Sequence, residues 1–174
     1  MPTIVIPFRA EGAKQRLPED LRAELARAML SDVVAAAEEV GRTIVAEGRG
    51  QGAAVEAALA DVHETSVLVV NADLPAATPR DLLALLGSIP GGGIAVAAAA
   101  DGTTNALGLS AHGLFEPLYG ASSAERFLAL APSRLVEIPN LAEDVDTLAD
   151  LERLEPRLGP RTLAAFESLR SAAR

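Results

Sequence analysis

Short runs of apolar, mostly β-branched residues alternate along the chain with longer segments in which apolar residues recur every three or four positions. The short runs predict strands, and the longer segments predict amphipathic helices. We expect strands at residues 3–8, 43–46, 66–71, 93–98, 106–110 and 135–138. We expect helices at residues 18–40, 53–60, 79–86, around Phe127, at 148–158 and around 163–169.

Several of these helices carry sequence signals at their ends. Thr78 and Thr147 each stand three residues before an aspartate, which is the pattern of a helix-capping box. Pro18 is followed by two acids, as is typical of a first helical turn, and Gly41 is placed to end that helix. Gly159 and the proline after it are expected to break the helix that begins after Thr147.

Alternating strands and helices predict an α/β fold with a mostly parallel sheet covered by helices on both faces, that is, three layers. The run 66–71 is continuously apolar, as is typical of the centre of a parallel sheet. Ligands of such folds bind outside the carboxyl ends of the strands. Polar clusters follow predicted strands at Arg9–Arg16, Ala72–Asp73 and Asp144–Asp146, so this edge is the expected site.

Composition narrows the chemistry that such a site can use. The 174 residues suit a single domain, 1–174, whose last helices span about 147–173, and 49% of the residues are hydrophobic. The 24 acids exceed the 15 bases, giving a net charge of −9, which disfavours nucleic acid and membrane surfaces as partners. There are no cysteines and two histidines, and the N-terminus lacks the basic stretch of a signal peptide. We therefore expect a cytoplasmic protein that works with carboxylates, cations, hydroxyls and backbone.

Three aspartates are candidate metal ligands. Asp73 follows the most apolar strand, and Asp144 and Asp146 are two residues apart, so in an extended segment they point to the same side. Taken singly, Asp73 is better explained as a turn former and Asp146 as an acid at a helix start, and only the three together favour a metal site. Three carboxylates converging on one edge repel one another unless a hard cation joins them, and Mg²⁺ is the usual cation beside phosphates.

The loop after the first strand is a candidate polyphosphate site. It contains Gly12, Lys14 and Arg16, and Lys14 is the single lysine of the chain. Backbone N–H groups at a strand-to-helix turn, together with a compact ammonium group, favour anion binding. The spacing is not that of a Walker A loop.

Two further groups of small residues offer backbone and hydroxyl donors. Residues 48–53 match Gly-x-Gly-x-x-Ala, with Asp73 twenty residues further on, as in a dinucleotide site. That reading is disfavoured because a strand and a helix already precede the motif. Loops 101–105 and 119–123 carry hydroxyls, and Ser123 either holds an anion or caps the following helix.

Taken together, these motifs resemble the phosphoenolpyruvate/2-phospho-L-lactate guanylyltransferases, which make the phosphodiester precursor of coenzyme F-420. The resemblance runs in order from about residue 3 to residue 155. Its segments are Gly12–Leu17, Ala72–Pro75, Gly102–Leu107, Tyr119–Ser123 and Asp144–Thr147.

The resemblance implies a nucleotide-diphospho-sugar-transferase-like fold that binds GTP, Mg²⁺ and a small phosphorylated carboxylic acid. It assigns the metal to Asp73, Asp144 and Asp146, and assigns Lys14 and Arg16 to charge neutralisation in catalysis. Nucleotide binding is implied for Gly12, Lys14, Arg16, Gly50, Gly52 and Asp73. Acceptor binding is implied for Thr104, Gly120 and Ser123.

The chain departs from the family pattern in its second strand-and-helix unit, which begins at Gly41. The stretch Gly41–Gly50 is much shorter than in the family, and Gln51-Gly52 stands where members commonly have Leu-Asn. That region normally helps to hold the base. Two alternatives therefore stand beside the guanylyltransferase reading: a trimmed relative that binds a nucleotide or partner without catalysis, and a molybdopterin- or sugar-phosphate-type nucleotidyltransferase.

Overall fold

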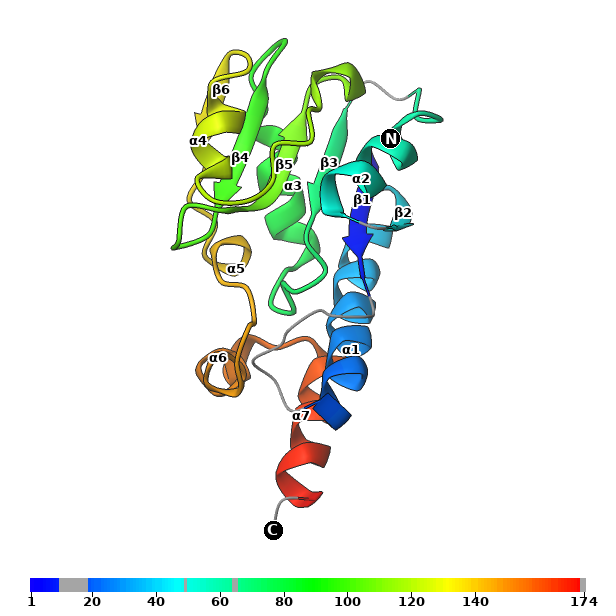
Figure 1. Cartoon of the computed structure of the whole chain (residues 1–174), viewed down its shortest axis with the longest axis vertical. Coiled ribbons are helices and arrows are strands. Elements are labelled where there is room, and N and C mark those ends of the chain that lie inside the picture. Colours follow the sequence, from blue (N-terminus) through cyan, green and yellow to red (C-terminus); the bar gives the residue numbers. More distant parts are fainter. Residues whose placement is uncertain (10–18, 49, 64–65, 173–174) are drawn as a thin grey trace.

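The computed structural model describes residues 1–9, 19–48, 50–63 and 66–172, and is built around a mixed six-stranded sheet (Figure 1). The strand order is β2-β1-β3-β5-β4-β6. Neighbours pair in parallel except that β5 runs antiparallel to both β3 and β4. The strands are β1 (Thr3–Phe8), β2 (Arg42–Glu47), β3 (Val67–Val70), β4 (Ile94–Ala98), β5 (Thr104–Leu109) and β6 (Ser133–Leu135).

Helices connect these strands and cover both faces of the sheet, which confirms the predicted α/β class. The α-helices are α1 (Glu19–Glu38), α2 (Gln51–Leu59), α3 (Pro79–Gly87), α4 (Ser123–Leu128), α5 (Pro139–Ala142), α6 (Leu148–Leu154) and α7 (Pro160–Ala172). Two short 3-10 turns are η1 (His112–Leu114) and η2 (Glu155–Arg157). In the part of the chain that the structure describes, no helix is long and apolar enough to cross a membrane.

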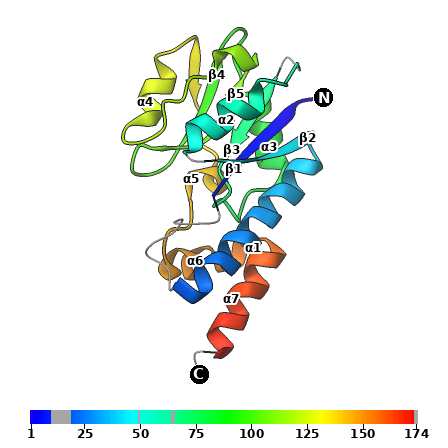
Figure 2. The same cartoon turned by 45° about the vertical axis from the view of Figure 1, so that its right-hand side comes forward.

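The three layers follow from the alternation of side chains along each strand. In β1, Ile4 and Ile6 face a core shared with α1, α3 and α5, whereas Val5 faces a core shared with α2 and α4. Leu25 and Met29 of α1 pack with apolar residues of α6 and α7 in a third cluster that includes Phe166. Figures 1 and 2 show α7 lying against α1 on the side where the C-terminus ends.

The two predicted capping boxes are present. The Thr78 hydroxyl accepts from the Asp81 N–H, and the Asp81 carboxylate accepts from Thr78 in return. Thr147 and Asp150 repeat the arrangement at the start of α6. These reciprocal bonds satisfy backbone donors that the first helical turn leaves without partners, so both helix starts lie where the sequence placed them.

Several predicted boundaries were wrong, among them the start of β5, which is Thr104 and not Ala106. The last strand is residues 133–135 instead of 135–138, because its pairing with β4 ends at Leu135 and Pro139 opens α5. The Val136 N–H is the last donor to β4, to the Val96 carbonyl at 2.9 Å. Consequently, Asp144–Asp146 follows a short helix and not a strand. The helix after Thr147 ends at Leu154, four residues early, because Pro156 cannot donate to a continued helix and a 3-10 turn replaces it. In α2, the helix begins at Gln51, two residues earlier than expected.

Candidate active site

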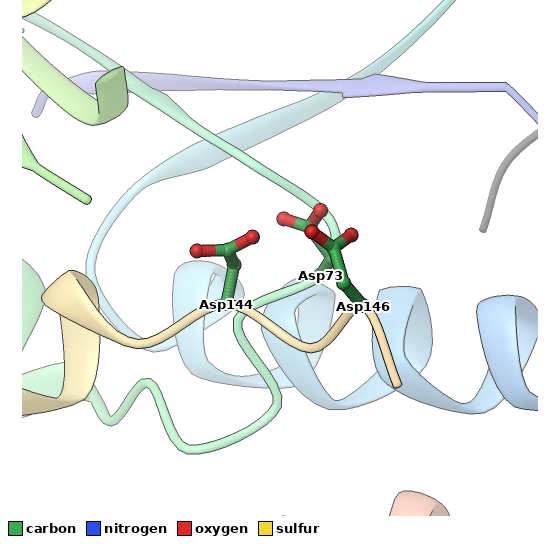
Figure 3. Close-up of side chains that lie close together, drawn as sticks. All are labelled: Asp73, Asp144 and Asp146. Atoms are coloured by element: carbon green, nitrogen blue, oxygen red, sulfur yellow. The ribbon is translucent and has the colours of Figure 1, made fainter. Parts of the chain in front are cut away.

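The three predicted metal ligands meet at the edge of the sheet beyond β3 (Figure 3). One carboxylate oxygen each of Asp73, Asp144 and Asp146 lies within 4.8 Å of the others. Asp73 and Asp144 are half-buried, and Asp146 is exposed. The side chains point to the same side of the backbone, so the expected convergence of these carboxylates is found despite the misplaced strand before Asp144.

A buried residue between Asp144 and Asp146 fixes the direction of these two side chains. Val145 is fully buried in the cluster beneath α1, and its N–H donates to the Asp73 carbonyl at 3.0 Å. Because successive side chains of an extended segment point to opposite sides, burial of Val145 turns Asp144 and Asp146 outward together. The same hydrogen bond ties that segment to the turn that carries Asp73.

Hydrogen bonds and an ion pair also hold the residues on both sides of the acidic segment, Asp144–Asp146. On its C-terminal side, the Asp150 carboxylate accepts from the N–H groups of Asp146 (3.1 Å) and Thr147 (2.8 Å). Partial burial raises the pKa of Asp150, but these hydrogen bonds, the Thr147 hydroxyl and the Arg153 charge outweigh it, so that the pKa is lowered overall. On the N-terminal side, Glu143 pairs with Arg157 at 3.0 Å.

Carboxamide side chains that sequence reasoning missed connect this cluster to the neighbouring strands. Asn105 donates to the Asp144 carboxylate at 3.3 Å. Asn71, at the end of β3, donates to the Thr104 carbonyl at 3.1 Å and accepts from the Gln51 side chain at 2.6 Å. Asn71 and Asn105 could have been found from the sequence as carboxamides at the ends of otherwise apolar strands, because a buried amide side chain needs a hydrogen-bond partner.

A cavity of about 300 Å³ opens beside Asp73, between the ends of β1 and β3 and the start of α2. Its walls are largely apolar and include Phe8 and Met29, with Arg9, Gln51 and Asp73 among the polar residues. Gly50, which has a left-handed φ of 98°, also lines it. Gly52 does not: a β-carbon there would stand 2.6 Å from Pro117 Cβ, so its small size serves packing against that proline.

The predicted acceptor residues lie together near the start of α4. The hydroxyls of Thr104 and Ser123 are 2.9 Å apart, and both residues are buried. Gly120 has a φ of 116° and its carbonyl accepts from the Ser123 N–H at 3.0 Å. Ser122, and not Ser123, occupies the cap position of α4, and no side-chain capping bond is formed there. The capping alternative for Ser123 is therefore wrong.

The remaining predicted site residues, Gly12, Lys14 and Arg16, lie outside the described residues. The dinucleotide alternative is also disfavoured by the structure. Its glycine motif follows β2, and Asp73, the residue it would assign to a ribose, lies in the acidic cluster with Asp144.

Comparison with solved structures places the fold among nucleotide-diphospho-sugar transferases. A protein from Desulfovibrio desulfuricans G20 named as such a transferase superposes with a TM-score of 0.72 at 16% identity, covering 98% of this chain and 95% of the other. Rv0371c of Mycobacterium tuberculosis, solved in complex with manganese, superposes with a TM-score of 0.50 at 24% identity over 88% of this chain and 96% of the other. These identities establish the fold alone.

Curated relatives establish the family. A phosphoenolpyruvate guanylyltransferase of Conexibacter woesei is 34% identical over 88% of this chain and 86% of its own length. A 2-phospho-L-lactate guanylyltransferase of Halorubrum lacusprofundi is 32% identical over 87% and 82%. The chain belongs to the phosphoenolpyruvate/2-phospho-L-lactate guanylyltransferase family. It spans about half (55%) of the length of another relative, the phosphoenolpyruvate guanylyltransferase of Nocardia farcinica, at 39% identity over 67% of this chain. No protein-family model matches it.

Proposed function

We propose that the protein transfers GMP from GTP to the phosphate of a small phosphorylated carboxylic acid, phosphoenolpyruvate or 2-phospho-L-lactate, and releases pyrophosphate. The observation that carries this proposal is the convergence of Asp73, Asp144 and Asp146 beside a cavity, in a chain of this family. Its place would be coenzyme F-420 biosynthesis in the cytoplasm. The net charge of −9 supports small-molecule partners over nucleic acid or anionic membrane.

The acidic cluster fits a divalent cation. Three oxygen donors within 4.8 Å of one another, one of them exposed, match a hard cation that keeps several waters and shares its coordination with phosphates. Mg²⁺ would be held by Asp73, Asp144 and Asp146, and would neutralise charge on the reacting phosphates. The manganese bound to the Mycobacterium tuberculosis neighbour of the same fold supports a metal in this fold.

The other residues bind and orient the substrates. Thr104, Gly120 and Ser123 would hold the phosphate and carboxylate of the acceptor, with two hydroxyls already 2.9 Å apart. Gly12, Lys14 and Arg16 would neutralise the GTP phosphates, and Lys14 and Arg16 would also stabilise charge in the transition state. Gly50 lines the cavity at the start of α2, where the nucleoside would lie with Asp73 at its rim.

The reaction needs no side-chain nucleophile. An ionised oxygen of the acceptor phosphate forms a bond to the α-phosphorus of GTP, and the bond from that phosphorus to the oxygen bridging to the β-phosphate breaks. Pyrophosphate leaves with the electron pair, and no net proton transfer is required. Catalysis is therefore positioning and charge neutralisation, which suits a chain with no cysteine and two histidines.

A specific observation favours a second candidate function. β2 ends at Glu47 and α2 begins at Gln51, so the connection near the nucleoside cavity is short. A chain trimmed there could bind a nucleotide or a partner without transferring GMP. The retained acidic cluster and Lys14 favour the active enzyme.

Product identification tests the proposal. The protein is incubated with GTP, Mg²⁺ and phosphoenolpyruvate or 2-phospho-L-lactate, and the guanylylated acid is sought by mass spectrometry. We expect a product of acceptor plus GMP that disappears with EDTA and in Asp146→Asn. Asp61→Asn, the same change at an exposed acid, serves as the matched control and should retain activity. Tight GTP binding without product for either acid would favour the trimmed relative.

A further inference from the structure

Asn105 is a buried carboxamide that reaches the acidic cluster from β5. It is 3% exposed, and its side-chain amide donates to Asp144 Oδ1 at 3.3 Å. A neutral donor holds a carboxylate without adding negative charge to a cluster that already contains three acids.

A β-bulge turns this side chain toward the cluster. The pairing of β4 with β5 runs from Ala97 opposite Ala106 to Ala98 opposite Thr104, so Asn105 is the extra residue. Regular alternation would place Thr104 and Ala106 on the same face of the sheet. Instead, Ala106 packs in the core shared with α1, α3 and α5, whereas Thr104 contacts Ser123 of α4 on the opposite face. Asn105, the extra residue between them, reaches Asp144. Bulges re-aim side chains in this way next to active sites.

The bulge is fixed by the end of the neighbouring strand. The Asn71 N–H donates to the Asn105 carbonyl at 3.0 Å, and the Asn71 side chain donates to the Thr104 carbonyl at 3.1 Å. Gln51 of α2 in turn donates to Asn71 at 2.6 Å. Both carbonyls of the bulged segment are therefore held, which limits the directions available to the Asn105 side chain.

We propose that Asn105 is a positioning residue that holds the Asp144 carboxylate in the orientation that binds the metal. The inference rests on the proposed function and assigns Asn105 no contact with substrate. Outer partners of metal-ligating carboxylates change metal affinity by about 10–100-fold when they are removed. Because the 3.3 Å bond is long, the lower end of that range, about tenfold, is expected here.

The test measures binding of Mn²⁺ alone by electron paramagnetic resonance, with no turnover. Asn105→Leu keeps the branched shape and removes the donor. Thr78→Val is the control, because the Thr78 hydroxyl also donates to a carboxylate outside the acidic cluster, that of Asp81 on α3, at 2.6 Å. We expect about tenfold weaker Mn²⁺ binding in Asn105→Leu and wild-type binding in Thr78→Val. Thermal unfolding of all the variants separates metal affinity from stability.

The outcomes are distinguishable. Wild-type Mn²⁺ affinity in folded Asn105→Leu would overturn the inference and leave the proposed function standing. Absence of Mn²⁺ binding by the wild-type protein would overturn the metal site itself. If Asn105→Leu does not fold, Asn105→Ala, which is smaller and also has no donor, gives the same comparison. An equal loss of affinity in Thr78→Val would show a general effect of lost stability and would contradict positioning.

Discussion

Asp32 on α1 caps the start of α7, and its removal is the most informative test of how α7 is held against α1. Its carboxylate accepts from the backbone N–H groups of Arg161 (3.1 Å) and Thr162 (2.8 Å) at the start of α7. It also accepts from the Thr162 hydroxyl at 2.7 Å. Asp32 is 5% exposed and Thr162 is fully buried. No nearby side chain of α7 is needed as a cap, because the cap comes from α1.

The cost of Asp32→Ala follows from these contacts. Leaving a buried donor without its acceptor costs about 1–3 kcal/mol, and loss of a helix cap alone costs about 1 kcal/mol. The two Thr162 donors are buried, whereas water can reach Arg161, so we expect a loss of about 3 kcal/mol in the free energy of unfolding. In a chain of this size, that corresponds to a fall in melting temperature of roughly 6–12 °C.

Urea unfolding followed by circular dichroism measures this difference. Glu24→Ala, at an exposed acid of the same helix, is the control and should change stability by less than about 0.5 kcal/mol. Loss of the Asp32 cap should also disturb the acidic cluster. The Gly159 N–H, just before α7, donates at 2.8 Å to the Pro75 carbonyl, which lies in the turn after Asp73. A loss below about 1 kcal/mol in Asp32→Ala would refute the reasoning, since it would mean that water satisfies the α7 donors.

Three further predictions concern the site and its supports. Thr104→Val should raise the KM for the acceptor at least tenfold while changing the KM for GTP little, because it removes one of two paired hydroxyls; a steady-state titration of each substrate measures both. Gln51→Leu should show the reverse pattern in the same assay, since Gln51 lines the cavity in which we propose that the nucleoside lies. Thr147→Ala should cost about 1 kcal/mol in urea unfolding through loss of the capping box, and unchanged stability would contradict that role.

The sequence was sufficient to predict those elements for which the local signals and the overall fold agree. Helix α3 begins after Thr78 as predicted, because a capping box and a proline at its start both point to the same residue. The clustering of Asp73 with Asp144 and Asp146 was also predicted, from the rule that strand ends of an α/β sheet meet at one edge, although only Asp73 follows a strand and the other two acids follow α5.

The sequence was insufficient where a tertiary contact decides the local structure. Residues 135–138 have the apolar pattern of a strand, yet pairing with β4 selects 133–135. Asn105 reads as one of several polar residues in a small loop, and only the bulge opposite β4 shows that it faces Asp144. Likewise, the cap that Asp32 provides joins residues about 130 positions apart, which no local pattern reveals.

Pyrophosphate release is the measurement that tests the central claim most directly. The purified protein is assayed with Mg²⁺ and each of GTP, ATP, CTP and UTP, against phosphoenolpyruvate, 2-phospho-L-lactate and 3-phosphoglycerate. We predict release with GTP and either phosphoenolpyruvate or 2-phospho-L-lactate, and its loss in Asp73→Asn. Release that depends on another nucleotide would contradict the guanine assignment. No release by folded protein across the whole panel would contradict the enzyme and favour a relative that only binds.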